Sequence, residues 1–186
     1  MKQDKGGIMI EGTTERNRVL IQWALLLLSL VGTGIALYLT AVHYENIPLF
    51  CSASGLVNCE RVTSSPYSVL FGTTIPITVP GLGWSIVSAV LAIVGLRTAS
   101  SPSGIFSRVV LAQFVWSLLG LLTVIYLVYV EIVLLHTICA WCTGLHVTIL
   151  AMFLLTLVLL LSGSTGPGEQ GEEEEDVSIS STPRLH

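Results

Sequence analysis

The residues with the clearest chemical potential are four cysteines, which fall into two pairs: Cys51 with Cys59, and Cys139 with Cys142. The first pair lies in a polar loop after one long apolar segment, and the second pair opens another such segment. A CxxC motif that opens a helix puts both thiols near unpaired backbone N–H groups, which stabilise a thiolate. Because the thiolate is the nucleophile in disulfide exchange, two such pairs within reach of each other indicate an electron relay.

Zinc binding and inert structural disulfides are the alternatives to redox chemistry. A CxxC motif is a common half of a zinc site, but seven residues separate Cys51 from Cys59, unlike the second tight pair of a zinc site built from four cysteines. A disulfide within CxxC closes almost no loop and so stabilises little through chain entropy. The spacing therefore favours a redox role and no metal, with structural disulfides as the more serious alternative.

Long apolar segments must position these cysteines. The chain has 186 residues, of which 52% are apolar and 11% charged, whereas soluble domains carry about 25% charged residues. Crossing a bilayer takes about 20 apolar residues, and helices of a soluble bundle would show a polar face. We therefore predict an all-α integral membrane protein, a bundle of four transmembrane helices with a long extracytoplasmic loop at residues 43–74. The expected spans are residues 19–42, 75–96, 109–135 and 138–161, the second marginal because Pro76, Pro80 and Gly81 open it.

The distribution of positive charge predicts the orientation. Lys and Arg are enriched on the cytoplasmic side of membrane proteins. Seven of the eight fall before the first span, between the second and third, or after the fourth: Lys2, Lys5, Arg16, Arg18, Arg97, Arg108 and Arg184. Only Arg61 lies in the opposite loops. Both termini are expected in the cytoplasm and all four cysteines on the extracytoplasmic face, where disulfides persist.

The chain outside the spans is expected to contain no second folded domain. Residues 1–18 would form a cytoplasmic tail, residues 19–161 the membrane domain, and residues 162–186 a disordered acidic tail containing the run Glu172–Asp176. The first apolar segment exceeds the usual signal-peptide core of about 7–15 residues, which predicts a retained anchor. There is no phosphate-binding loop and no basic patch, so no nucleic-acid partner is expected.

The cysteine pattern resembles the vitamin K epoxide reductase family. The resemblance rests on Cys51-x7-Cys59, the sequence Glu-Arg-Val-Thr-Ser-Ser-Pro-Tyr after it, the Gly-containing entry to the second span, and a later span opened by CxxC. It covers about residues 20–160. It implies a four-helix bundle around a quinone of menaquinone, ubiquinone or vitamin K type. Electrons would pass from a thioredoxin-fold partner to the loop pair, then to CxxC, then to the quinone.

The resemblance also implies a function and a setting. Bacterial members support oxidative protein folding outside the cytoplasm, and animal members reduce vitamin K epoxide and quinone. This chain resembles a bacterial-type member without a fused thioredoxin domain, so a separate extracytoplasmic thioredoxin-fold (DsbA-like) partner and a bacterial inner or cell membrane are expected. The alternatives are vitamin K epoxide reduction in the animal sense and a non-catalytic scaffold with structural disulfides. Which loop cysteine exchanges with Cys139 stays open.

Three residues are quinone-binding candidates by position. Ser65 matches a recurrent serine of the family, although a turn or helix-capping role fits equally well. His146 lies one helical turn after Cys142, where animal members tend to have a tyrosine, and either a quinone contact or a helix–helix hydrogen bond fits it. Trp141, inside CxxC, is a candidate lining residue. For His43, His136 and Glu131 at the outer span ends, an ordinary interfacial role is favoured over proton transfer.

Overall fold

The computed structural model describes residues 5–45, 49, 51, 57–70, 73–99 and 104–163, with side chains described from residue 15 to residue 162. Four long helices dominate: α1 (Lys5–Glu45), α3 (Thr78–Thr98), α4 (Ile105–Tyr129) and α5 (Ala140–Gly163). Each is long and apolar enough to cross a membrane. The predicted all-α membrane bundle is therefore confirmed, while most of the predicted acidic tail (residues 164–186) lies outside the described residues.

Two helix starts show how local sequence sets the boundaries. The second expected span is one continuous helix, because Pro80 lies in the first turn of α3, where a missing N–H costs nothing. The helix α1 already begins at Lys5, well before the expected start of the first span at residue 19. No proline interrupts the sequence between these points.

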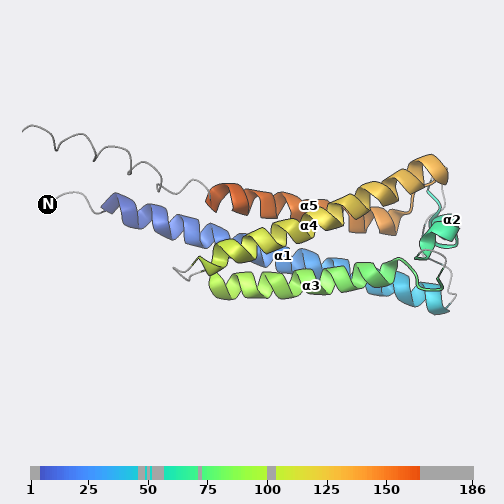
Figure 1. Cartoon of the computed structure of the whole chain (residues 1–186), viewed down its shortest axis with the longest axis horizontal. Coiled ribbons are helices and arrows are strands. Elements are labelled where there is room, and N and C mark those ends of the chain that lie inside the picture. The colour runs from blue at the N-terminus through green and yellow to red at the C-terminus, as the bar shows by residue number, and fades with distance from the viewer. Residues whose placement is uncertain are drawn as a thin grey trace, which may run out of the picture.

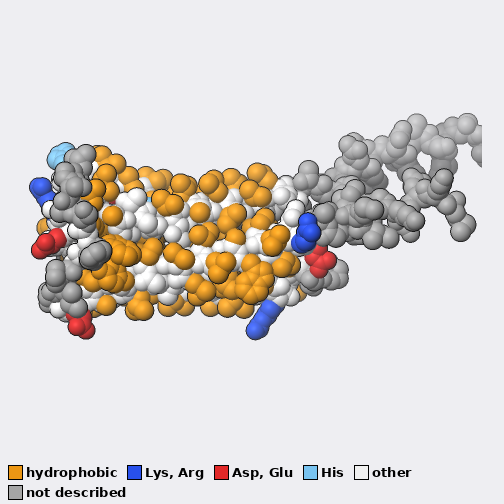
Figure 2. Space-filling model, turned by 180° about the vertical axis from the view of Figure 1, so that it is seen from behind, with side chains coloured by type: hydrophobic (Ala, Val, Ile, Leu, Met, Phe, Trp, Pro, Cys, Tyr) orange, Lys and Arg blue, Asp and Glu red, His pale blue; other side chains and the backbone are white. Residues whose placement is uncertain are grey.

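The four helices close into a ring, in which α1 packs against α3 and α5, and α4 packs against the same two helices (Figure 1). The core between them contains Leu25, Ala92, Phe106, Val110, Met152 and Leu159. Large apolar side chains also cover the outside, including Leu27, Leu37, Leu122, Val147 and Leu154. Figure 2 shows this apolar belt along the bundle, with charged side chains gathered at its two ends. A bilayer is the environment that such a surface fits.

The end of the bundle opposite the N-terminus is covered by a short helix, α2 (Cys59–Thr63), and a 3-10 turn, η1 (Pro66–Ser68) (Figure 1). Two isolated bridges fasten this cover to the helices. Val57 pairs with Ile138, directly before α5, and Val69 pairs with Pro76, directly before α3. The described part of the long loop is thus tied to the start of the helix that carries CxxC.

The connection from α4 to α5 is a tight turn. Here α4 passes into a π-helical turn, η2 (Val130–Leu134), and the chain reverses at His136, whose backbone is left-handed at φ 50°. Leu135 N–H donates to the Val130 carbonyl at 2.9 Å, and Thr137 N–H donates to the Glu131 carbonyl at 3.0 Å. These bonds fix where α5 begins relative to the end of η2.

Candidate redox site

The loop pair forms a disulfide between Cys51 and Cys59, with Cα atoms 6.1 Å apart. Cys59 is the first residue of α2, and the Asn58 side chain caps this helix by accepting from Arg61 N–H at 3.0 Å. The two sulfurs differ in access, because Cys59 is 1% exposed whereas Cys51 is only half-buried. Cys51 is therefore the better target for a molecule that approaches from outside.

The CxxC pair opens α5 as two free thiols. Cys139 precedes the first helical residue, and its Sγ accepts from Cys142 N–H at 3.3 Å. Its carbonyl accepts from both the N–H and the hydroxyl of Thr143 at 2.9 Å. A hydrogen bond from the Cys142 thiol, helped by the N–H groups of Cys142 and Trp141, lowers the pKa of Cys139 against the opposing effects of burial and the Glu131 charge. Cys139 is thus prepared to react as a thiolate.

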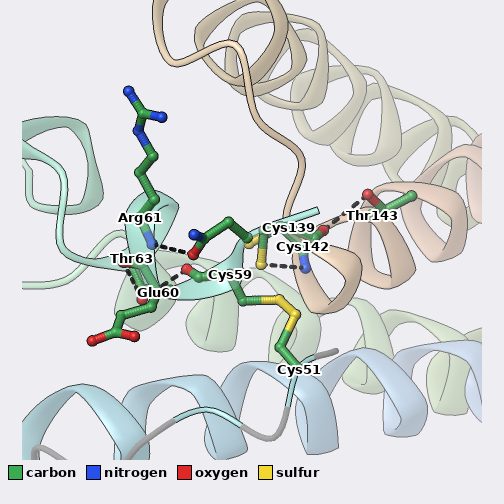
Figure 3. The surroundings of a disulfide bond; sticks show 9 residues. Cys51, Cys59, Glu60, Arg61, Thr63, Cys139, Cys142 and Thr143 are labelled. Atoms are coloured by element: carbon green, nitrogen blue, oxygen red, sulfur yellow. Dashed lines mark hydrogen bonds between the residues drawn. A yellow bond between two sulfur atoms is a disulfide. The ribbon is translucent and has the colours of Figure 1, made fainter. Parts of the chain in front are cut away.

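The bridge between Val57 and Ile138 brings the two pairs together. Asn58 N–H donates to the Ile138 carbonyl at 3.1 Å, so a cysteine follows closely on each side of the bridge: Cys59 on one segment and Cys139 on the other. In Figure 3, Cys59 lies on the side of the disulfide toward Cys139 and Cys142, and Cys51 lies beyond it. Both Cys59 and Cys139 are almost completely buried, at 1% and 0% exposure.

A cavity of about 430 Å³ lies beside the CxxC pair, in the size range of small-molecule sites. All four long helices, η2 and the α2–η1 cover contribute to its wall. Most of the lining is apolar, and the polar groups include Cys142, His146, Glu131 and Ser65. Of the four cysteines, Cys142 alone is among the described lining residues, so this sulfur has access to a molecule held in the cavity.

The three candidate quinone contacts are placed differently. His146 is 7% exposed, lines the cavity, and accepts or donates no hydrogen bond within the described part of the chain. Ser65 also lines the cavity, but its hydroxyl donates to the Val62 carbonyl at 2.8 Å, which leaves only its lone pairs for a ligand. Trp141 is not among the described lining residues, and its ring packs against Tyr38 with centroids 4.8 Å apart.

Two residues for which the sequence favoured an ordinary interfacial role line the cavity in the structure. Glu131 is 5% exposed and lines the cavity, and His43 lines it from α1. By contrast, His136 is exposed in the turn. Glu131 could have been singled out from the sequence as an ionisable residue in an otherwise uncharged span. Its burial could not, because the turn that buries it leaves no mark on the hydropathy of the sequence.

The space and its lining suit a quinone. A quinone has a flat apolar ring system with two carbonyl oxygens that accept hydrogen bonds. The wall offers apolar side chains, an imidazole free to donate at His146, and a thiol at Cys142 for the redox step.

Comparison with models of known protein families finds a match. The family model described as "Vitamin K epoxide reductase family" matches residues 23–157, which include all four cysteines and most of the four long helices. A comparison with curated proteins finds no similar sequence.

Proposed function

Because the chain belongs to the vitamin K epoxide reductase family, we propose that its two cysteine pairs carry electrons from a thioredoxin-fold protein to a quinone. The family establishes the broader statement, that the chain is an integral membrane oxidoreductase of the thiol–disulfide and quinone type. The finer route rests on one observation. The Val57–Ile138 bridge puts Cys59 beside Cys139, and Cys142 opens on the cavity.

The first exchange takes place at the half-buried end of the loop disulfide. A thiolate of the partner attacks Cys51, the Cys51–Cys59 bond breaks, and the partner's second thiol completes its own disulfide. The partner is oxidised by two electrons and the loop pair is reduced to a dithiol. Burial of Cys59 supports this order, because a protein-sized partner reaches Cys51 more easily.

The second exchange moves the electrons to CxxC. The Cys59 thiolate attacks Cys139 in the Cys139–Cys142 disulfide, a Cys59–Cys139 bond forms, and Cys142 is released. Cys51 then attacks Cys59, which restores the loop disulfide and leaves Cys139 reduced. The low pKa of Cys139 makes it a good leaving group in this last step.

Quinone reduction completes the cycle at the cavity. A bound quinone supplies a two-electron, two-proton acceptor. Cys142 presents its sulfur at the wall, His146 offers a hydrogen bond, and the apolar lining excludes water. As the Cys139–Cys142 disulfide re-forms, the dithiol loses two electrons and two protons, which balances the formation of a hydroquinone.

The membrane setting is part of the proposal. Arg16, Arg18, Arg97 and Arg108 lie on the helix ends away from the cysteines, and Arg61 lies in α2 at the cysteine end. Figure 2 shows Lys and Arg side chains at both ends of the bundle. The positive-inside rule then puts both termini in the cytoplasm and both cysteine pairs outside it. The partner is accordingly a thioredoxin-fold protein that works in an oxidising compartment, as in a bacterial cell envelope.

Purified protein mixed with reduced DsbA and a short-chain ubiquinone tests this function. We expect quinone absorbance to fall with turnover, and Cys139→Ser or Cys142→Ser to abolish it. Thr123→Ser, an exposed hydroxyl on α4, is the control. Quinone reduction that is equally fast without the two thiols would rule out the relay.

Peptide mapping under non-reducing conditions tests the order of transfer. In Cys51→Ser the Cys59 thiol attacks the Cys139–Cys142 disulfide and no loop thiol can resolve the product, so we expect the Cys59–Cys139 bond to accumulate once quinone has oxidised CxxC. The same bond should accumulate in Cys142→Ser. A Cys51–Cys139 bond in Cys142→Ser would reverse the roles assigned to the two loop cysteines.

A further inference from the structure

Glu131 is a buried carboxylate in direct contact with the CxxC pair. Its side chain is 5% exposed, at the η2 turn. The carboxylate accepts a hydrogen bond from the backbone N–H of Cys139 and lies within reach of the Cys142 thiol, whose single hydrogen can bond either this carboxylate or the Cys139 sulfur. It also lines the cavity, so it touches both the reactive sulfur and the space beside it.

The turn between α4 and α5 holds this carboxylate in place. The Glu131 carbonyl accepts from Thr137 N–H at 3.0 Å, while the Glu131 side chain accepts from the N–H of Cys139. Between them the left-handed backbone of His136 reverses the chain. Glu131 therefore accepts hydrogen bonds from two residues of the connection between α4 and α5, one through its backbone carbonyl and one through its side chain. π-Helical turns such as η2 occur frequently at functional sites.

An anchoring role alone does not require a carboxylate. An amide oxygen at residue 131 would accept the same bond from Cys139 N–H without the desolvation cost of a buried charge. That cost is large inside a membrane span, where ionisable residues are rare and functional. The feature that an amide cannot reproduce is the ability to take the proton of the Cys142 thiol.

Building on the function proposed above, we propose that Glu131 is the catalytic proton acceptor for Cys142 and carries its proton into the cavity. Closing the Cys139–Cys142 disulfide breaks the S–H bond of Cys142 and forms an S–S bond. The Cys142 proton passes to the carboxylate and from there to the reduced acceptor in the cavity. Cys139 has released its own proton to water before the step, and one proton from water completes the two that the acceptor needs.

Other ionisable groups face the same space, and each must be considered when pH is varied. They come from α5, from α1, and from α2 and η1: Cys142, His146, His43, Glu60 and Tyr67. Cys139 does not line the cavity but interacts with Glu131 directly. Glu45, the last residue of α1, is exposed and is not among the residues that line the cavity. It therefore provides a control carboxylate at the same end of the bundle.

The decisive variant is Glu131→Gln, which keeps an acceptor for Cys139 N–H and removes the proton acceptor. Reduced protein is mixed with a short-chain ubiquinone, and a single oxidation of CxxC is followed across a range of pH. We expect Glu131→Gln to be slower by about 100-fold at neutral pH, the scale of general base catalysis. The deficit should shrink as pH rises, because hydroxide then deprotonates Cys142. Glu45→Gln should match the unmodified protein.

A second variant, Glu131→Ala, leaves room for a small carboxylate. Formate should restore its rate in proportion to concentration and leave the unmodified protein and Glu45→Gln unchanged. A Glu131→Gln rate within about twofold of the unmodified protein, or a deficit that is equal at every pH with no rescue of Glu131→Ala by formate, would overturn the assignment.

A parallel series replaces the quinone with dipyridyl disulfide. Cys139 attacks this reagent first, and Cys142 must still lose its proton to close the disulfide, so the same pH-dependent deficit is expected. If the unmodified protein is not oxidised by quinone but the deficit appears with dipyridyl disulfide, the quinone assignment fails and the role of Glu131 stands. If the deficit is missing in both series, the role of Glu131 fails.

Discussion

Polar side chains are buried at two levels of this bundle. At one level they hydrogen-bond to each other, and at the other they face a cavity. At the level away from the cysteines, Gln22 on α1 and Gln113 on α4 exchange two amide hydrogen bonds at 3.0 and 2.9 Å. The residual space beside Gln113 is only about 10 Å³. At the cysteine end, His146 and Glu131 face a cavity of about 430 Å³. We refer to these as the closed level and the open level.

The difference separates two reasons for polarity within a membrane span. At the closed level each polar group is the partner of another, so it contributes to helix association. At the open level polar groups line a space in which they can meet a ligand. Substitutions at the closed level should therefore lower stability and preserve turnover of the folded protein. Substitutions at the open level should impair ligand binding or turnover and preserve stability.

The largest stability effect is expected where a glycine lets α4 approach α3. Trp84 and Trp116 each donate an indole N–H to the other's carbonyl at 3.2 Å, and a Cβ on Gly120 would lie 2.6 Å from the Trp84 ring. Because the indole N–H bond to the Trp116 carbonyl holds the Trp84 ring in place, Gly120→Val should destabilise the fold by about 3 kcal/mol through overpacking. Unfolding in mixed micelles measures this, with Gly34→Val as control because a Cβ at Gly34 meets nothing within 4 Å.

The next effect concerns the glutamine pair. Gln22→Leu leaves the Gln113 amide, which is 5% exposed, without its partner, and we expect a loss of about 1–3 kcal/mol. The double variant Gln22→Leu/Gln113→Leu removes both polar groups and should recover most of that loss. Quinone turnover by the folded fraction should stay at the unmodified level in both. A double variant less stable than the single one would show that the two amides stabilise the fold by more than satisfying each other's hydrogen bonds.

At the open level His146→Phe should affect ligand binding and spare stability. The ring of phenylalanine fills a similar volume but cannot donate a hydrogen bond. Loss of one bond worth about 0.5–1.5 kcal/mol should raise the quinone KM by about twofold to about tenfold. Thr148→Val is the control on the same helix, because its hydroxyl donates to the Gly144 carbonyl at 2.8 Å and does not line the cavity. A lower thermal midpoint with unchanged KM would assign His146 to packing.

Sequence alone was sufficient for the fold because the bilayer imposes a simple rule. Four apolar stretches of span length predict four helices, and the structure contains them. The start of α5 at CxxC also follows from the hydropathy boundary. The proximity of Cys59 to Cys139 does not, because it depends on one bridge between Val57 and Ile138, residues far apart in the sequence.

The side-chain contacts at the open level could not be predicted from the sequence either, because they also depend on tertiary structure. Glu131 looked like an ordinary residue at a span end, and only the π-helical turn and the reversal at His136 bring it against Cys139 and Cys142. Trp141 looked like a lining residue because it lies inside CxxC. The register of α5 decides which way each side chain points, and here it turns the Trp141 ring toward Tyr38.

The smallest expected effect returns to the closed level, at the hydroxyl pair of Ser117 and Thr156, whose oxygens lie 3.0 Å apart. Each hydroxyl also has a backbone acceptor within its own helix: the Phe114 carbonyl at 2.9 Å for Ser117, and the Phe153 carbonyl at 2.9 Å for Thr156. Since each carries one hydrogen, only one can donate across the interface at a time. Removal of Ser117 therefore leaves Thr156 bonded to its own helix.

We expect Ser117→Ala to cost about 0.6 kcal/mol, the mean for hydrogen bonds between membrane helices. Ser117→Ala/Thr156→Val should cost little more than the single change, and turnover should be unaffected in both. Unfolding in mixed micelles gives the first result and the quinone assay gives the second. A fall in turnover without a fall in stability would mean that this pair communicates with the cavity, and the division into a closed and an open level would then fail at its weakest contact.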